Sequence, residues 1–154
     1  MNCILSFYKF ASWFLSLFIS MNSCYKIYPE LNLGVARLRP GEKSFDELYT
    51  LVSDIRNDQD FENINYQITD LRGCIFNFDT RKIAEMASLV EKNIEKDNQK
   101  VGVYVTDKPI STAYVQFFFN KLRHKREFCS TLEGAYQLLK MDVTYDDFIN
   151  LLDI

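Results

Sequence analysis

The chain has 154 residues, 47% of them hydrophobic and 25% charged, which is typical of one globular domain with a sizeable core. With 13 Phe and 9 Tyr but only 5 Gly and 3 Pro, the composition excludes a largely disordered chain and favours packed elements with short connections. The formal net charge of −3 provides no general basic field for a phosphate backbone, so we expect no nucleic-acid partner.

The metal-binding and redox-active residue types are sparse. The chain has four cysteines and one histidine, with no C-x-x-C motif and no cluster of the two types. This pattern predicts no metal site and no cofactor, and it fits a reducing, cytoplasmic location.

Residues 1–20 form an apolar extension whose only charge is Lys9. Three interpretations remain open: a signal or lipoprotein segment, a membrane anchor, and sequence upstream of a translation start at Met21. The uncharged run from Phe10 to Tyr25 is shorter than the roughly 20 residues that span a bilayer. We therefore treat residues 21–154 as the domain. A membrane is expected as a partner only if residues 1–20 are retained, and export or membrane attachment is the alternative to a cytoplasmic protein.

The first elements of the domain are predicted to be a β-hairpin and a helix. Residues 25–31 and 33–39 have strand-like patterns and are separated by Asn32, and residues 40–44 break the pattern with Pro and Gly. Ser44-x-x-Glu47 is a capping box, and the apolar spacing that follows predicts a helix ending near Asn57.

The middle of the chain alternates between strands and helices. Residues 64–71 are a predicted strand, and residues 80–96 a helix with Ile83, Ala87, Val90 and Ile94 facing inward. Residues 100–107 form a nearly continuous apolar run, which predicts a central strand covered on both faces. Pro109, with Ser111 or Thr112 as the cap, opens a helix through Leu122.

The last elements are a short strand and two helices. Residues 126–130 form the strand, Ser130-x-x-Glu133 is a second capping box for a helix over 132–140, and Thr144 caps a last helix. The order of elements predicts an α/β fold with a single mostly parallel sheet, an N-terminal β-hairpin and helices packed on the sheet.

Two short motifs resemble a known family. The turn Asp70-Leu71-Arg72-Gly73 is followed by Asp79-Thr80 at the start of the next helix. This order resembles the STAS domain superfamily, in particular the SpoIIAA-like, STAS/SEC14-type small bacterial proteins, where a D-L-S-G-like turn leads to D-S at a helix N-terminus. The resemblance runs from about Tyr25 to Met141. It implies a SpoIIAA/STAS-like fold, and it carries the family's phosphorylatable serine over to Thr80. The small residues that follow the acceptor in the family are replaced here by Arg81 and Lys82, a departure that fits better with the divergent SpoIIAA-like branch.

Candidate binding residues follow two predicted strands at their carboxyl ends, where open α/β sheets place ligands. We expect a binding rim formed by Asp70, Arg72, Asp79, Arg81, Asp107, Ser111 and Thr112, with Thr80 as a phosphoacceptor candidate. Each feature also has a simpler interpretation. Asp79 and Thr80 cap a helix, Asp70 and Arg72 form a local ion pair, and Ser111 or Thr112 caps the next helix.

No residue pattern indicates catalysis. Cys74 and His124 come from unrelated segments and have no third orienting residue, so no catalytic residue is assigned and we expect no enzyme. The basic cluster over residues 121–126 complements a helix C-terminus, or it binds an acidic protein surface or an anionic lipid head group. The leading hypothesis is a non-enzymatic regulatory module that binds a protein, a second copy of the chain included. The alternative, implied by the family resemblance, is a nucleotide- or lipid-binding domain.

Overall fold

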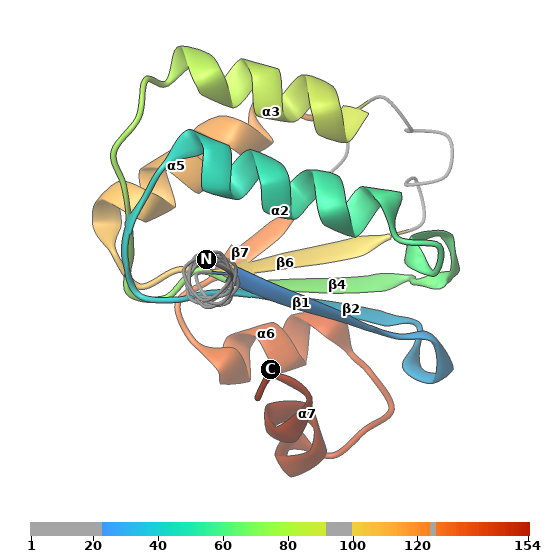
Figure 1. Ribbon diagram of the computed structural model, residues 1–154. Helices are drawn as coiled ribbons and strands as arrows, with labels where there is room; N and C mark the ends of the chain where they lie inside the picture. Colours follow the sequence, from blue (N-terminus) through green and yellow to red (C-terminus); the bar gives the residue numbers. More distant parts are fainter. Residues whose placement is uncertain (1–22, 92–99, 124–125) are drawn as a thin grey trace, which may run out of the picture.

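The computed structural model describes residues 23–91, 100–123 and 126–154, and its centre is a five-stranded sheet (Figure 1). The strand order is β1-β2-β4-β6-β7. The strands are β1 (Ser23–Tyr28), β2 (Leu33–Leu38), β4 (Tyr66–Asp70), β6 (Val101–Val105) and β7 (Glu127–Cys129). β1 pairs antiparallel with β2, and the other pairs are parallel. The predicted sheet with its N-terminal hairpin is therefore confirmed.

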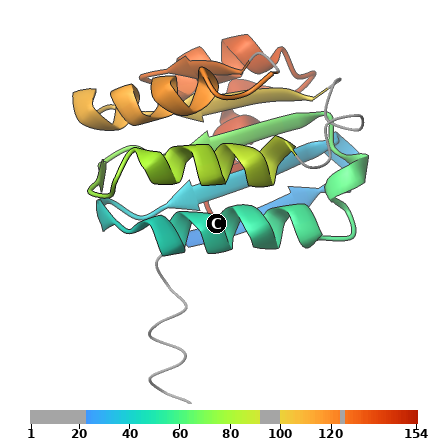
Figure 2. The same ribbon diagram turned by 90° about the horizontal axis from the view of Figure 1, so that it is seen from above.

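Helices cover both faces of this sheet. One face carries α2 (Phe45–Asn57), α3 (Arg81–Glu91) and α5 (Pro109–Phe119), and the other carries α6 (Leu132–Leu139) and α7 (Tyr145–Leu151). α3 packs against α2 and α5, and it lies between them when the molecule is seen from above (Figure 2). No helix within the described ranges has the length and apolarity needed to cross a membrane.

The first hairpin is shorter than predicted. β1 ends at Tyr28, because Pro29–Leu31 forms a 3-10 turn and cannot continue the ladder from Pro29, which has no N–H. Asn32 takes a left-handed conformation, with φ 52°, and its N–H donates to the Pro29 carbonyl at 3.1 Å. Asn tolerates this conformation better than most residues do, so Asn32 is the pivot of the turn.

A second, two-stranded sheet was not predicted. β3 (Gly41–Lys43) pairs in parallel with β5 (Cys74–Phe76), where the sequence pattern indicated a break and a loop. Gly73 precedes β5 with φ 73°, and a Cβ at this position would lie 2.8 Å from the Pro40 side chain. Only glycine allows this close approach, so Gly73 fixes the loop after β4 against the loop after β2.

The helix boundaries confirm some predictions and correct others. The Ser44 capping box of α2 is confirmed: Ser44 Oγ accepts from the Glu47 N–H at 3.3 Å, and the Ser44 N–H donates to Glu47 Oε2 at 2.8 Å. The second capping box is wrong by one residue, because α6 is capped by Thr131, whose Oγ1 accepts from the Gly134 N–H at 3.1 Å. Thr144 caps α7 as predicted.

Two further helices differ from their predicted limits. α5 has Lys108 at its N-cap position, so Ser111 and Thr112 lie inside the helix and do not cap it, and the helix ends at Phe119 rather than Leu122. α3 begins at Arg81, and its predicted inward residues Ile83, Ala87 and Val90 are buried. The predicted extension to residue 96, with Ile94, lies outside the described residues.

β6 is buried but not central. Val103 and Val105, which face α6 and α7, are fully buried, and Tyr104 on the other face of the strand is half-buried. β4 is the middle strand, however, and β6 lies between β4 and the edge strand β7. The carboxyl ends of β2, β4, β6 and β7 meet at one edge of the sheet, and this edge carries the predicted rim.

Candidate functional site

The predicted rim is made from two segments, residues 70–81, which follow β4 and include β5, and residues 106–112, which follow β6 and include the start of α5. Hydrogen bonds join them. The Gly73 N–H donates to Asp107 Oδ1 at 2.7 Å, and Ser111 Oγ donates to the Cys74 carbonyl at 2.6 Å. The structure thus brings together the two segments that the sequence analysis assigned to one site.

Asp70 and Arg72 form a bidentate ion pair within the rim. Arg72 Nε donates to Asp70 Oδ1 at 2.9 Å, and Arg72 Nη2 donates to Asp70 Oδ2 at 2.8 Å. The Asp70 residue is only 3% exposed and also accepts the Arg72 backbone N–H at 3.1 Å. These contacts raise the pKa of Arg72, mainly through its hydrogen bonds to Asp70. The arrangement matches the local ion-pair interpretation, and it leaves Asp70 turned away from solvent.

Asp107 is an exposed carboxylate tied to the opposite loop. The hydrogen bond from the Gly73 N–H is the main cause of its lowered pKa, and the positive charges of Lys108 and Arg72 act in the same direction. Asp107 therefore stays ionised at neutral pH, and it presents a fixed negative charge at the centre of the rim.

Asp79, Thr80 and Arg81 form the start of α3. Asp79 Oδ1 accepts the Arg81 backbone N–H at 2.8 Å, and Asp79 Oδ2 accepts Arg81 Nε at 2.7 Å, with a further contact to Arg81 Nη2. These hydrogen bonds lower the pKa of Asp79 to about 2. Thr80 is exposed, and its carbonyl accepts the Ile83 N–H at 3.0 Å. The Thr80 hydroxyl is therefore accessible to solvent at the positive end of a helix.

Ser111 and Thr112 do not present hydroxyls at the surface of the rim. Ser111 is fully buried beneath it, where its hydroxyl donates to Cys74. Thr112 Oγ1 donates to the Lys108 carbonyl at 3.0 Å, one turn earlier in α5. Both side chains are thus engaged within the fold, and the exposed residues among those predicted for the rim are Asp79, Thr80, Arg81 and Asp107.

Two apolar residues of the rim were missed by the sequence analysis. Ile110 is 54% exposed and Ile75 is 42% exposed, more than any other large hydrophobic side chain of the described residues. Ile75 points outward because its neighbours on β5, Cys74 and Phe76, point into the core. Ile110 adjoins Ser111, which binds the Cys74 carbonyl, so the two isoleucines belong to neighbouring parts of one surface. The alternation of β5 is the signal that could have identified Ile75.

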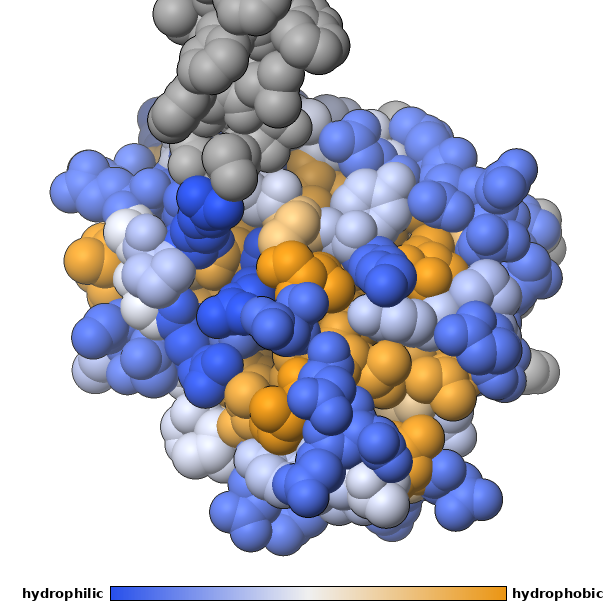
Figure 3. Space-filling model, turned by 60° about the horizontal axis from the view of Figure 1, so that its bottom comes forward, coloured by the Kyte–Doolittle hydropathy of each residue, from blue (hydrophilic) through white to orange (hydrophobic). Residues whose placement is uncertain are grey.

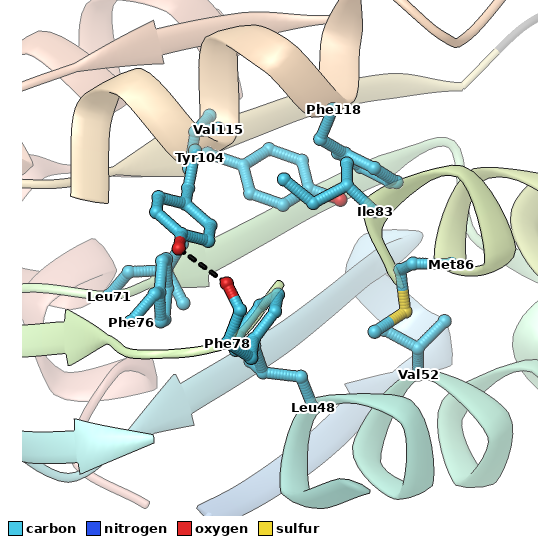
Figure 4. A pocket seen from close by; sticks show the side chains of 11 residues that line it. Leu48, Val52, Leu71, Phe76, Phe78, Ile83, Met86, Tyr104, Val115 and Phe118 are labelled. Atoms are coloured by element: carbon cyan, nitrogen blue, oxygen red, sulfur yellow. Dashed lines mark hydrogen bonds between the residues drawn. The ribbon is translucent and has the colours of Figure 1, made fainter. Parts of the chain in front are cut away.

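An apolar cavity of about 80 Å³ lies behind the rim, between α2, α3 and α5 (Figure 4). Figure 4 shows its side chains converging from the three helices and from the strand ends below them. The one hydroxyl drawn with a partner is that of Tyr114, which donates to the Phe78 carbonyl at 2.6 Å. The lining residues are Leu48, Val52, Leu71, Phe76, Phe78, Ile83, Met86, Tyr104, Tyr114, Val115 and Phe118.

The remaining candidates of the sequence analysis lie elsewhere or are inaccessible. Cys74 is fully buried, and burial raises the pKa of its thiol to about 11, which keeps it protonated and unreactive. His124 and Lys125 lie outside the described residues. Of the rest of the basic cluster, Arg123 contacts Glu91 of α3, and Arg126 Nη1 donates to the Lys100 carbonyl at 3.0 Å. Across the described ranges, no three His, Cys, Asp or Glu residues come together as a metal site.

Comparison with known proteins does not assign a family. The sequence matches no protein-family model and no curated protein. The similarity of the Asp70–Gly73 turn and of Asp79-Thr80 to the STAS superfamily therefore stays a prediction from those motifs.

Proposed function

We propose that this chain is a non-enzymatic, STAS-like regulatory module that binds a protein partner through the rim. The observation that carries this proposal is the exposure of Ile75 and Ile110, the two most exposed large hydrophobic side chains of the described residues, on the same two segments that carry the charged side chains of Asp79, Arg81 and Asp107. Protein interfaces combine apolar contacts at the centre with charged and polar groups around them. The rim has both components, on two segments that the Gly73–Asp107 and Ser111–Cys74 hydrogen bonds join.

Thr80 is the proposed switch of this surface. Its exposed hydroxyl precedes α3 and lies next to Arg81 and Lys82 in the chain. A phosphate there would add a charge of about −1.5 to −2 and compete with Asp79 for the Arg81 guanidinium. Because Asp79 and Arg81 both lie on the rim, phosphorylation would change the charge pattern that a partner meets.

Site-specific photo-crosslinking in native cells tests the partner surface. A photoreactive amino acid replaces Ile75 or Ile110 in the full chain, and Leu138 serves as the control because it is also exposed but lies on α6. We expect one discrete adduct of the same mass from positions 75 and 110 and none from position 138. Equal adducts from all three positions, or none from the rim, would contradict the proposal.

Intact-mass measurement and peptide mapping across residues 72–91 test the switch. We expect a phosphate on Thr80 in a fraction of the molecules, and a Thr80→Glu variant that changes the yield of the rim adduct relative to Thr80→Ala. If Thr80 is never modified and both variants crosslink like the parent chain, the pair Asp79-Thr80 is only the start of a helix. The partner surface would then be constitutive.

The location proposed for this module is the cytoplasm. Cys24, Cys74 and Cys129 are free thiols in the described part of the chain, which supports a reducing compartment. Thiol alkylation in intact cells, followed by mass spectrometry, tests this location. Protein isolated with these cysteines oxidised would contradict it.

Binding of a small apolar ligand is the second candidate, and the cavity behind the rim favours it. Its lining is almost entirely hydrocarbon and aromatic, so it suits a lipid-like group and lacks the polar groups that a nucleotide requires. At about 80 Å³ it is smaller than the engineered cavity of about 150 Å³ that binds benzene. Only the end of an acyl chain or a ligand of a few heavy atoms would fit without movement of a helix.

Methyl NMR of the full chain tests this candidate. Titration with a short-chain alcohol such as pentanol should shift the methyl signals of Ile83, Met86 and Val115, which line the cavity, and leave Val103 on the opposite face unchanged. Shifts distributed equally over both faces, or no shifts, would contradict ligand binding in the cavity.

A further inference from the structure

The described chain begins at the same edge of the sheet as the rim. β1 is antiparallel to β2, and Ser23 pairs with Leu38 at the carboxyl end of β2. Leu38 also adjoins the rim, because its carbonyl accepts the Cys74 thiol at 3.8 Å. Residues 1–22 are therefore joined to the domain next to the loops that carry Ile75 and Ile110.

The connection between the apolar extension and this edge is short. Only Met21 and Asn22 separate Ser20 from Ser23. Because consecutive Cα atoms are 3.8 Å apart, the end of the extension cannot lie more than about 11 Å from the rim edge. Any surface that takes up the extension is thus brought close to this edge.

The apolar extension needs a larger apolar environment than the rim provides. Between Ile4 and Ser20 its large side chains occur at almost every position, and Lys9 is its only charge. The rim exposes two large aliphatic side chains, which can cover only a small part of such a segment. A bilayer can bury all of it, and insertion of an apolar segment from one side does not require the length of a full membrane span.

We propose that the rim lies against a phospholipid bilayer into which residues 1–20 insert, with Ile75 and Ile110 in contact with the bilayer interface. This inference goes beyond the proposed function and does not depend on it. Contact with the bilayer would cover Ile75 and Ile110, the side chains assigned above to a protein partner, so the two proposals give the same surface different occupants and the experiments separate them.

The charges of the rim predict how this contact depends on lipid composition. Asp70, Asp79 and Asp107 are balanced by Arg72, Arg81 and Lys108, and the first pair is internally neutralised. Arg37 also contacts Asp70, at 3.9 Å, so the rim carries at most a small net positive charge and hydrocarbon contact supplies most of the binding. We expect vesicle binding to change little between phosphatidylcholine alone and mixtures with phosphatidylserine, and between low and high salt.

Tryptophan quenching by brominated lipid tests the orientation directly. The chain has one tryptophan, Trp13, inside the extension. In the full chain with Trp13→Phe, a single tryptophan is introduced by Ile110→Trp or by Val101→Trp. Val101 is similarly exposed but lies at the amino end of β6, about 15 Å further along the strand direction. Vesicles of phosphatidylcholine with brominated acyl chains supply the quencher, and Ile75→Trp is a second rim position.

The expected result is loss of most of the fluorescence of Trp13 in the parent chain and of the tryptophan at position 110 or 75, with no loss at position 101. Equal quenching at positions 110 and 101, quenching of Trp13 without quenching at either rim position, or no quenching of Trp13 would overturn the proposal. A binding curve that depends strongly on phosphatidylserine would overturn the hydrocarbon contact. Rim quenching without a protein adduct in the crosslinking experiment would defeat only the proposed protein partner.

Discussion

The two faces of the sheet are packed differently. On the α6–α7 face, Ile68, Val103, Val105 and Phe148 are fully buried, and the helices cover the strands directly. On the other face, α3 rests on α2 and α5, and a cavity remains beneath it. Figure 3, seen from the α6–α7 side, shows hydrophobic surface divided by hydrophilic side chains.

The difference follows from the placement of the helices. Both faces contain an aromatic cluster, Tyr136, Tyr145 and Phe148 on the α6–α7 face and Phe76, Phe78 and Tyr114 on the other, with ring centroids 5.1 to 6.4 Å apart. On the α2–α3–α5 face three helices meet over the strands, and space is left where they meet. The α6–α7 face is therefore expected to contribute more to stability. The more loosely packed α2–α3–α5 face adjoins the rim, where binding and conformational change are expected.

The largest effect should come from removing a ring on the well-packed face. Phe148→Ala is expected to lower the free energy of unfolding by about 3–5 kcal/mol, because Phe148 is fully buried between α7 and the sheet. Phe118→Ala on the cavity should cost clearly less, because Phe118 is only partly buried and already borders empty space. Urea denaturation of both variants measures this, and equal losses would show that the two faces are packed alike.

The next effect concerns the pH dependence of stability that arises from Cys74, which is buried on the α2–α3–α5 face. Burial raises the pKa of Cys74 to about 11 from an ordinary 9.0, so the folded state holds the thiol proton more strongly than the unfolded state does. This contribution to stability is complete below pH 9 and is lost as the pH rises towards 11, about 2–3 kcal/mol in all.

Urea denaturation between pH 8 and pH 11 measures this loss, with Cys74→Ala as the matched control. The alanine variant is less stable throughout, but its stability should fall less steeply above pH 9. Parallel pH profiles for the two proteins would mean that water reaches Cys74 and that the rim opens readily.

A smaller effect is expected when a buried side chain is enlarged on each face of the sheet in turn. Val103→Ile places a methylene group in the closed face and should cost about 1–3 kcal/mol. Val115→Ile places the same group at the cavity and should be neutral or stabilise by up to about 0.8 kcal/mol. Thermal unfolding of the two variants gives the sign of each change, and a loss from Val115→Ile as large as that from Val103→Ile would show that the cavity is closed in solution.

The elements that periodicity could predict are those whose residues form long, regular patterns. The capping box at Ser44, the helix to Asn57 and the buried run through Val103 each have a local signal that the structure confirms. β3 and β5 have only three residues each, and Pro40 and Gly41 indicate a turn, so only pairing between distant segments makes them strands. The cap of α6 is Thr131 and not the predicted Ser130, because the two residues are adjacent and equally suited to the N-cap position.

The site was predictable as a location but not in its details. Parallel strands bring Asp70 and Asp107 to one edge, and the rule for open α/β sheets identifies that edge. The burial of Ser111 depends on the Cys74 carbonyl of an unpredicted strand. The exposure of Ile75 depends on the same strand, because without β5 nothing indicates which side of residues 74–76 faces the core.

The smallest effect tests the ion pair at the rim. Arg81, whose side chain is 90% exposed, lowers the pKa of Asp79 to about 2 from an ordinary 3.8. The contribution of this pair to stability is therefore present above pH 4 and lost as the pH falls towards 2. Carboxyl-carbon NMR should show Asp79 titrating near pH 2 in the parent chain and near pH 4 in Arg81→Gln. An ordinary pKa in the parent chain would mean that solvent competes successfully for Arg81. The Arg81 guanidinium would then be free to bind a phosphate on Thr80 without displacing Asp79. Phosphorylation would not have to break the Asp79–Arg81 ion pair, so the switch at the rim would cost less free energy.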